Sequence, residues 1–243
     1  MENQNPNYTY DNVIQIEDAD QSRKFIANVF AWMFVALGIS SLCAYEFATN
    51  PSLLRSLFDA ATGQPTFLFY VAMLSPLAFV LLIRFGLNRI SYLGLTLLFI
   101  AYSAATGISL SFILLVYTSS SVLGVFLTSS LVFGIMAVAG YTTKTDLTKF
   151  GSLMIMGLFG IIIASVVNIF LHSSGLNMLI SYVGVAVFVG LTAYDVQKLK
   201  RIGAGLEYGD ASAKKMALMG GLTLYLDFIN LFLMLLRIFG RRR

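Results

Sequence analysis

Seven apolar runs, each about as long as a membrane is thick, divide most of the chain between them. A spanning helix needs about 20 predominantly apolar residues to cross a hydrocarbon core of about 30 Å. The runs occupy residues 25–47, 67–87, 90–117, 122–141, 150–171, 178–199 and 216–239. This pattern predicts an all-α integral membrane protein with seven transmembrane helices. Because the gaps between the runs are short, we expect successive helices to pack antiparallel.

The composition is that of a membrane protein rather than of a soluble domain. Apolar residues make up 58% of the chain and charged residues 12%, whereas a soluble domain carries about 25% charged residues. The net charge of +4 is spread over the gaps between the runs. No basic stripe interleaves with aromatic residues, so we expect the lipid bilayer as a partner and no nucleic acid. The single cysteine, Cys43, excludes an intrachain disulfide.

The predicted domain organisation is one helical domain between two tails. Residues 1–22 are polar and acidic and lack the basic start and apolar core of a signal peptide, so we expect a disordered cytoplasmic tail. Residues 23–240 form a single transmembrane domain, and residues 241–243 form a basic C-terminal tail. Small residues within the runs, such as Gly107 and Gly190, favour close approach between helices.

The distribution of basic residues predicts the topology. Cytoplasmic gaps of membrane proteins carry an excess of Lys and Arg. If the N-terminus is cytoplasmic, the cytoplasmic segments hold Arg23, Lys24, Arg89, Lys144, Lys149, Lys198, Lys200, Arg201, Lys214 and Lys215. The opposite loops hold Arg55, but seven crossings also place Arg237 and the basic residues 241–243 outside. Six crossings with one re-entrant run are therefore the alternative to seven.

Three acidic residues lie in or at the edge of apolar runs: Glu46, Asp195 and Asp227. An ionisable group at the centre of a spanning helix costs about 2.5–3.5 kcal/mol, so such groups face a partner or a water-filled cavity. Asp227 has apolar residues on both sides, and Asn230 lies three residues further on, on the same helical face. Asp195 follows Tyr194 near the end of the sixth run. These residues are candidates for a functional site.

The predicted depths of these charges coincide. At about 1.5 Å per residue, Asp195 and Asp227 lie ~6 Å and ~8 Å inside the cytoplasmic ends of the last two runs. Arg84 lies three residues before the cytoplasmic end of the second run. Two close carboxylates share a proton, and a nearby arginine favours ionisation, so this set is suited to pH gating. A snorkelling Arg84 is the alternative, and we expect Glu46 and Arg237 to pair as anchors near the outer face.

At these residues the chain resembles the Bax inhibitor-1 family, also called the transmembrane Bax inhibitor motif proteins. The most specific matches are Thr106-Gly-Ile-Ser-Leu-Ser, Gly190-Leu-Thr-Ala-Tyr-Asp-Val-Gln-Lys and Leu224-Tyr-Leu-Asp-Phe-Ile-Asn-Leu-Phe-Leu. The resemblance spans residues 20–240 and implies a seven-helix fold in which the other six helices surround a central last helix. It also implies a bacterial member that lies in the inner membrane.

The resemblance further implies a pH-sensitive calcium leak without enzymatic activity. In bacterial family members an aspartate pair from the last two helices is the pH sensor and an arginine of the second helix is a latch, which match Asp195, Asp227 and Arg84. Calcium prefers six to eight oxygen ligands. The two aspartates therefore predict weak or transient calcium binding, suited to passage. Calcium is then the transported ion, and we expect no cofactor.

Other functions compete with the calcium leak. A non-conducting protein that modulates membrane partners is an alternative, because family members are linked to suppression of cell death. An intramembrane aspartyl protease requires Gly-x-Gly-Asp, whereas this chain has Leu224-Tyr-Leu-Asp227. A serine intramembrane protease is disfavoured, because Gly107-Ile-Ser109 is a short match and His172, the one histidine, lies at the end of the fifth run.

Overall fold

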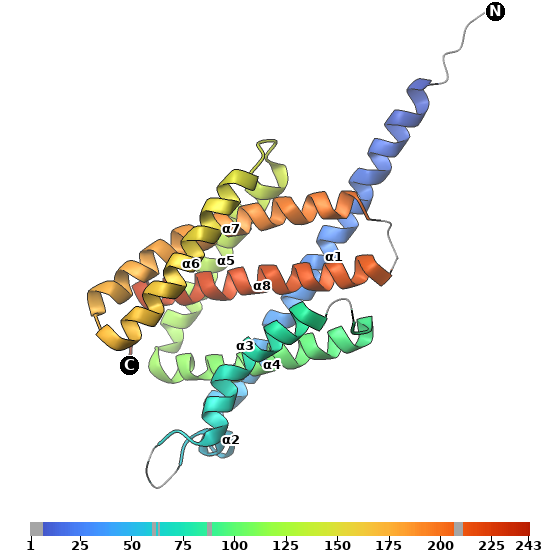
Figure 1. Cartoon of the computed structure of the whole chain (residues 1–243). Coiled ribbons are helices and arrows are strands. Elements are labelled where there is room, and N and C mark those ends of the chain that lie inside the picture. The colour runs from blue at the N-terminus through green and yellow to red at the C-terminus, as the bar shows by residue number, and fades with distance from the viewer. Residues whose placement is uncertain (1–6, 60–61, 63, 87–88, 207–210) are drawn as a thin grey trace, which may run out of the picture.

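The computed structural model describes residues 7–59, 62, 64–86, 89–206 and 211–243, and for residues 7–19, Arg84 and Ala211 it describes the backbone alone. The described chain is helical (Figure 1). Its helices are α1 (Asn7–Thr49), α2 (Pro51–Leu57), α3 (Phe67–Gly86), α4 (Tyr92–Val116), α5 (Ser119–Thr142), α6 (Thr148–Leu171), α7 (Ser174–Ala204) and α8 (Ala211–Phe239). The predicted all-α class is therefore confirmed.

Six of these helices are long and apolar enough to cross a membrane. They are α1 from Asp20 onward, α4, α5, α6, α7 and α8. The second predicted run corresponds to α3, whose described apolar part is the shorter stretch Phe67–Ile83. This stretch contains Pro76, which lacks the N–H of a helical hydrogen bond. The structure therefore supports a multi-pass membrane protein, and the seventh crossing stays a prediction.

Helix α1 begins earlier than the apolar pattern predicts. We expected disorder in residues 1–22, but the helix extends back to Asn7. The sequence contains neither Gly nor Pro from Asn7 to Leu37, so nothing in it interrupts the helical backbone. Near the start of the apolar part, Lys24 Nζ lies 2.6 Å from Asp20 Oδ2, one helical turn away. Residues 1–6 lie outside the described part of the chain.

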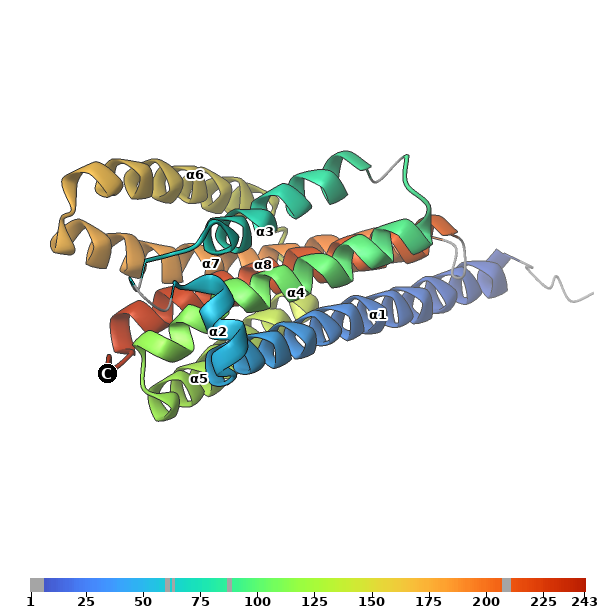
Figure 2. The ribbon, with the colours of Figure 1, turned by 90° about the horizontal axis from the view of Figure 1, so that it is seen from below.

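Helix α8 lies at the centre of the bundle. In its most apolar 18-residue stretch 61% of the residues are buried, compared with 6% in α6. It packs against α1, α4, α5 and α7, whereas α3 packs chiefly on α4, and α6 on α7, at the outside (Figure 2). The predicted central position of the last helix is thus observed. The expectation that six helices surround it is too simple, because α3 and α6 form an outer layer.

The outer surface is apolar, as a lipid environment requires. Large side chains on α3 and α6 are strongly exposed, including Phe67, Phe85 and Phe170 at 83%, 80% and 80%. A monomeric soluble protein rarely exposes contiguous apolar patches of this kind. In a bilayer these side chains contact lipid tails at no cost, which is consistent with the membrane localisation.

Close packing of the inner helices depends on glycine at defined positions. A side chain at Gly107 in α4 would collide with the backbone of Ser40 in α1. A side chain at Gly140 in α5 would collide with the backbone of Ala193 in α7. At the first of these crossings, Ser40 Oγ donates a 2.7 Å hydrogen bond to the Ser103 carbonyl and lies 2.7 Å from the Tyr225 hydroxyl. These contacts tie α1 and α4 to the central helix.

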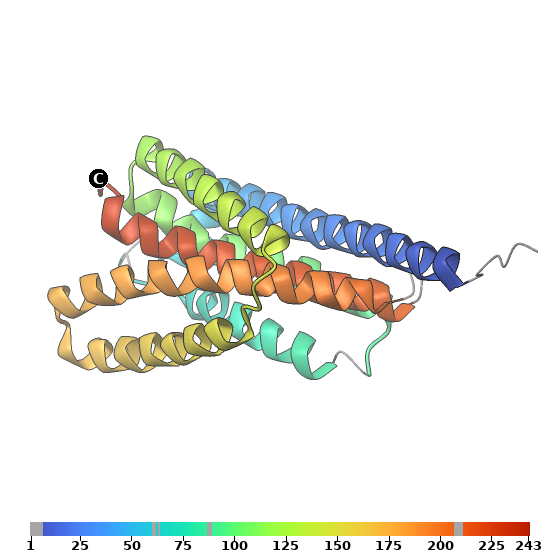
Figure 3. The same ribbon diagram turned by 90° about the horizontal axis from the view of Figure 1, so that it is seen from above.

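The described chain begins and ends at opposite ends of the bundle. The start of α1 and the end of α8 lie at opposite ends (Figure 3). The tail after α8 is held by the α4–α5 turn, where Thr118 N donates to the Arg241 carbonyl at 3.0 Å and Arg243 N to the Val116 carbonyl at 3.0 Å. We call the end at which α1 begins and α7 finishes the basic end, because the predicted cytoplasmic Lys and Arg residues lie there.

Candidate functional site

The two intramembrane aspartates meet at the interface between α7 and α8. The Asp227 side chain is 5% exposed in the most buried helix. Its carboxyl group interacts with that of Asp195, which is half-buried on α7. Because α7 and α8 are consecutive antiparallel helices that pack on each other, two residues at equal depth below the basic end can meet where both face the interface. The structure therefore brings together the two residues that the sequence placed at one level of the membrane.

This contact constrains the protonation of the pair. An ionised carboxylate accepts hydrogen bonds but cannot donate one. A hydrogen bond between Asp195 and Asp227 would therefore require a proton on one of them. The remaining oxygen, Asp227 Oδ2, is buried without a hydrogen-bond partner among the described residues. Because a buried ionised carboxylate without compensation is costly, this geometry favours a pair that holds one proton.

The polar neighbours predicted to support the pair face elsewhere. Asn230 Nδ2 donates to the Leu226 carbonyl of its own helix at 2.8 Å. The Tyr194 ring lies where a side chain at Gly151 of α6 would stand, so it packs toward α6. Since adjacent helical residues point about 100° apart, this leaves Asp195 directed at α8. Neither polar neighbour forms a described hydrogen bond with the carboxyl pair.

For the predicted latch, Arg84, the structure describes the backbone alone. Arg84 is in the last turn of α3, but its side chain lies outside the described residues. Its role as a latch therefore stays a prediction. Asp195 has an interaction of its own in addition to the contact with Asp227. The described geometry therefore contains the carboxyl pair but not the side chain of its predicted partner, Arg84.

The predicted pairing of Glu46 with Arg237 is wrong for the described structure. Glu46 is exposed on α1 and forms no ion pair with Arg237. Arg237 lines a cavity of about 480 Å³ at the far end of the bundle, with Asn168, His172 and Asn177 among its walls. A count of depth along each helix does not specify the face of the bundle on which a residue lies.

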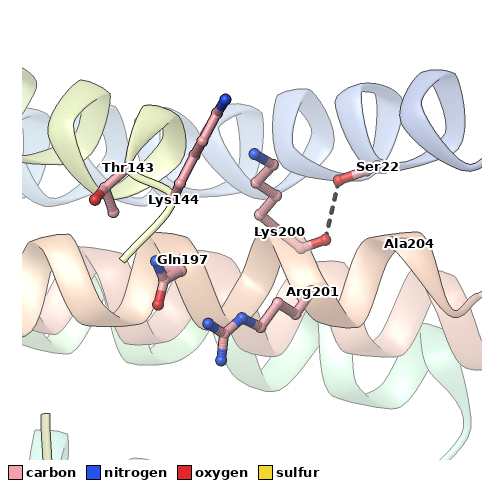
Figure 4. Close-up of a pocket in the computed structure, with 7 residues that line it drawn as sticks. All are labelled: Ser22, Thr143, Lys144, Gln197, Lys200, Arg201 and Ala204. Atoms are coloured by element: carbon pink, nitrogen blue, oxygen red, sulfur yellow. Dashed lines mark hydrogen bonds between the residues drawn. The ribbon is translucent and has the colours of Figure 1, made fainter. Parts of the chain in front are cut away.

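Sequence reasoning missed a second polar site, at the basic end. A cavity of about 310 Å³, which we call the basic pocket, is lined by Ser22, Thr143, Lys144, Gln197, Lys200, Arg201 and Ala204 (Figure 4). Gln197 anchors the α5–α6 linker, since its Nε2 donates to the Thr145 carbonyl at 2.8 Å and its Oε1 accepts from Leu147 N at 2.9 Å. The sequence signal for this pocket is the helical spacing of Gln197, Lys200 and Arg201. The sequence alone assigns the two basic residues to a cytoplasmic segment and indicates no role for Gln197.

One acidic residue beside the basic pocket, Asp146, forms an ion pair with Arg201. Asp146 Oδ1 lies 2.9 Å from Arg201 Nη2 and accepts hydrogen bonds from the Thr148 backbone N–H and hydroxyl at 2.9 and 2.6 Å. The bonds from Thr148, followed by that from Arg201, lower the pKa of Asp146 from 3.8 to about 2. The carboxylate is therefore ionised at neutral pH and holds Arg201 against the start of α6.

In the part of the chain that the structure describes, no three His, Cys, Asp or Glu side chains gather where they could hold a metal ion. The carboxyl pair offers at most four oxygens, fewer than the six to eight that calcium prefers. Any calcium at the pair would complete its coordination with water or backbone carbonyls. The donor set of the pair is therefore smaller than a stable calcium site requires.

Known proteins resemble this chain over nearly its whole length. Residues 22–243 match the family described as inhibitor of apoptosis-promoting Bax1. An inner membrane protein of Escherichia coli, YbhL, is 44% identical over 90% of this chain and 92% of its own length. An uncharacterized protein of Borreliella burgdorferi is 46% identical over 90% of this chain and 93% of its own. An uncharacterized membrane protein of Streptococcus pyogenes is 35% identical over 95% and 98%.

Proposed function

Since the chain belongs to the Bax inhibitor-1 family of membrane proteins, we propose that it is a pH-sensitive calcium leak of the bacterial inner membrane. Asp195 and Asp227 form its gate. The observation that carries this proposal is the contact between the two carboxyl groups at the interface of α7 and the central helix α8, where Asp227 is buried. No other pair of acidic side chains in the described bundle joins two spanning helices in this way.

We take the gate to have two arrangements. In the first, one proton holds Asp195 and Asp227 together and α7 stays packed on α8. In the second, the proton has left and the two carboxylates repel each other. Two unit charges 4 Å apart at an effective dielectric constant of about 20 repel by about 4 kcal/mol. A helix pair whose two states differ by a few kcal/mol would change its population in response.

Arg84 has a natural role in the second arrangement. A carboxylate released from the pair needs a new partner, because an unpaired charge in the membrane interior is costly. Arg84 belongs to α3, which packs in the outer layer on α4 and lies at the level of the pair by helix count. Capture of Asp195 by Arg84 would stabilise the separated state, and this is the latch that the family resemblance implies.

The topology that we propose has seven crossings and a cytoplasmic N-terminus. The start of α1 and the end of α8 lie at opposite ends of the bundle, as an odd number of crossings requires (Figure 2). Six long apolar helices together with α3 give that number. The excess of Lys and Arg at the basic end then assigns this end to the cytoplasm.

The test is calcium flux through the purified protein in lipid vesicles that contain a calcium-sensitive dye. We expect the flux of the wild-type protein to change with pH. In the Asp227→Asn and Asp195→Asn variants an amide replaces a titrating carboxyl, so the dependence on pH should disappear. Asn230→Leu is the matched control, because it removes a polar group one turn away in α8 that bonds only its own helix.

The outcomes of this experiment separate the candidate functions. Absence of calcium flux at every pH would favour the alternative, a non-conducting protein that modulates membrane partners. An unchanged pH profile in both aspartate variants would show that calcium passes but that the carboxyl pair is not the gate. A profile lost equally in Asn230→Leu would point to general damage of α8.

A further inference from the structure

The basic pocket continues into an apolar groove on the surface of the bundle. The groove has a volume of about 320 Å³ and is lined by Arg23, Ile26, Ala27, Phe30, Ala137, Val138, Tyr141 and Val196. Its walls come from α1 and α5, and α7 contributes Val196 between them. The two cavities adjoin, because Ser22 and Arg23 are neighbours on α1 and Val196 and Gln197 are neighbours on α7.

The groove reaches from the basic end into the apolar layer of the membrane. Along α1 it spans Arg23 to Phe30, which is ~10 Å at about 1.5 Å per residue. Apart from Arg23 at the mouth, its lining residues are apolar or aromatic. Ala27 and Val138 in its walls are exposed, so the groove opens at the outer surface of the bundle and does not lie in the core. A linear hydrocarbon chain matches its shape and polarity.

The cations where the basic pocket meets the groove form no ion pair with any described acidic residue. Lys144 and Arg23 are exposed and have no ion-pair partner among the described residues. Lys200 Nζ donates to the Tyr141 carbonyl at 2.8 Å and lies 4.7 Å from the centre of the Tyr141 ring. Figure 4 shows the ammonium groups of Lys144 and Lys200 on one side of α7, whereas the Arg201 guanidinium points to the other side.

The positions of these groups are fixed by contacts between helices. Ser22 Oγ of α1 donates to the Lys200 carbonyl of α7 at 2.9 Å (Figure 4). Gln197 holds the linker that carries Lys144. Arg201 is already neutralised by Asp146. The excess positive charge therefore comes from Arg23, Lys144 and Lys200, which lie where the basic pocket meets the groove.

We propose that this pocket and groove together bind an anionic glycerophospholipid. Its phosphate group lies among Arg23, Lys144 and Lys200, and the upper part of one acyl chain lies in the apolar groove between α1 and α5. Basic pockets between transmembrane helices bind anionic headgroups for this electrostatic reason. The occupant is a lipid and not a soluble anion, because the same site joins a cationic mouth to an apolar channel that faces the bilayer.

This lipid site does not depend on calcium conduction and is tested by itself. The purified protein is taken from vesicles of equal parts phosphatidylglycerol and phosphatidylcholine, and the retained lipids are counted by native mass spectrometry. We expect one phosphatidylglycerol to be retained in preference to phosphatidylcholine. At about 1 kcal/mol per basic residue near the membrane surface, the Lys144→Gln/Lys200→Gln variant should lose this preference about 30-fold.

Single substitutions and a matched control keep the result interpretable. Lys144→Gln alone changes an exposed side chain and should lower the preference about fivefold without affecting folding. Lys149→Gln removes the same charge at the same end of the bundle, outside both cavities, and should leave the preference unchanged. If Lys149→Gln lowers the preference as much as Lys144→Gln, general surface charge explains the binding and the proposed site is refuted.

A second arm distinguishes a lipid from a free phosphate compound. Ala27→Trp fills the exposed apolar groove and leaves every charge in place. It should reduce the retention of phosphatidylglycerol, and glycerol phosphate added in excess should not displace the lipid from the wild-type protein. Displacement by glycerol phosphate together with unchanged retention in Ala27→Trp would identify a soluble-anion site and overturn the proposal. Equal retention of the two lipids by the wild-type protein would also overturn it.

Discussion

The crossing of α5 over α7 at Gly140 gives a sharp prediction for stability. A Cβ atom at this position would stand 2.8 Å from both the carbonyl carbon and the Cα of Ala193, whereas ordinary contact begins at 3.4 Å. The two helices must therefore separate by at least 0.6 Å, the difference between 3.4 and 2.8 Å, to admit one methyl group. The obstacle is backbone, which cannot rotate away as a side chain would.

This separation has a calculable cost. A gap of about 0.5–1 Å forfeits a quarter to a half of the dispersion attraction between facing atoms. Insertion of a methyl group into a packed core costs about 1–3 kcal/mol. We therefore expect Gly140→Ala to lower the free energy of unfolding by about 1–3 kcal/mol. Because Ala193 lies two residues before Asp195, the change should also displace the carboxyl pair.

The same helix supplies the control. Gly134 lies in α5 with open space where its Cβ would stand, so Gly134→Ala should leave stability unchanged or raise it by up to about 1 kcal/mol through helix propensity. Unfolding of both variants is followed by circular dichroism in detergent micelles with increasing denaturant. Equal effects of Gly140→Ala and Gly134→Ala would refute the reasoning that this crossing depends on glycine.

Three further substitutions test other contacts. Asp146 has a pKa lowered to about 2, so its stabilising effect is present above about pH 4 and lost as the pH falls toward 2; the difference in melting temperature between wild type and Asp146→Asn should disappear over this range. Gln197→Leu leaves the N–H of Leu147 without its partner and should cost about 1–3 kcal/mol in denaturant unfolding. Tyr225→Phe should cost about 0.5–1.5 kcal/mol, and in a Ser40→Ala background it should cost clearly less; additive effects would contradict the hydrogen bond between them.

The sequence predicted the helices well where apolar length is the deciding property. A run of about 20 apolar residues has few alternatives to a helix in a membrane, so α4 to α8 were expected near their observed positions. The first helix was predicted from its apolar part only, because the segment from Asn7 to Phe25 is polar and shows no apolar period. Its helical backbone follows from the absence of Gly and Pro, which is a weaker signal.

The shared depth of Asp195 and Asp227 was predictable because depth is a position along one axis. Asp195 and Asp227 belong to consecutive antiparallel helices, so counting residues from the connecting loop gives their relative depth. The same count failed for Glu46 and Arg237, because two residues at one depth can lie on different sides of a bundle. Rotation of each helix about its axis depends on packing, which one sequence does not specify.

The basic pocket was not predictable for a related reason. It is assembled from α1, the α5–α6 linker and α7, and the Ser22–Lys200 contact joins residues 178 positions apart. In the sequence, Lys144 and Lys200 look like ordinary charges of cytoplasmic loops. Only the fold shows that they gather above an apolar groove and that no described carboxylate forms an ion pair with them.

The central claim is that Asp195 and Asp227 hold one proton between them inside the membrane, and infrared spectroscopy of the protein in lipid vesicles tests it directly. A protonated carboxyl group has a carbonyl stretching band separate from that of a carboxylate. Our account predicts such a band near neutral pH, at a pH where exposed carboxyl groups are ionised. The band should be lost on raising the pH and absent in Asp227→Asn, and in Asp195→Asn it should shift, because the buried Asp227 carboxyl loses its partner. A band that persists unchanged in Asp227→Asn, or no band in the wild-type protein, would contradict it.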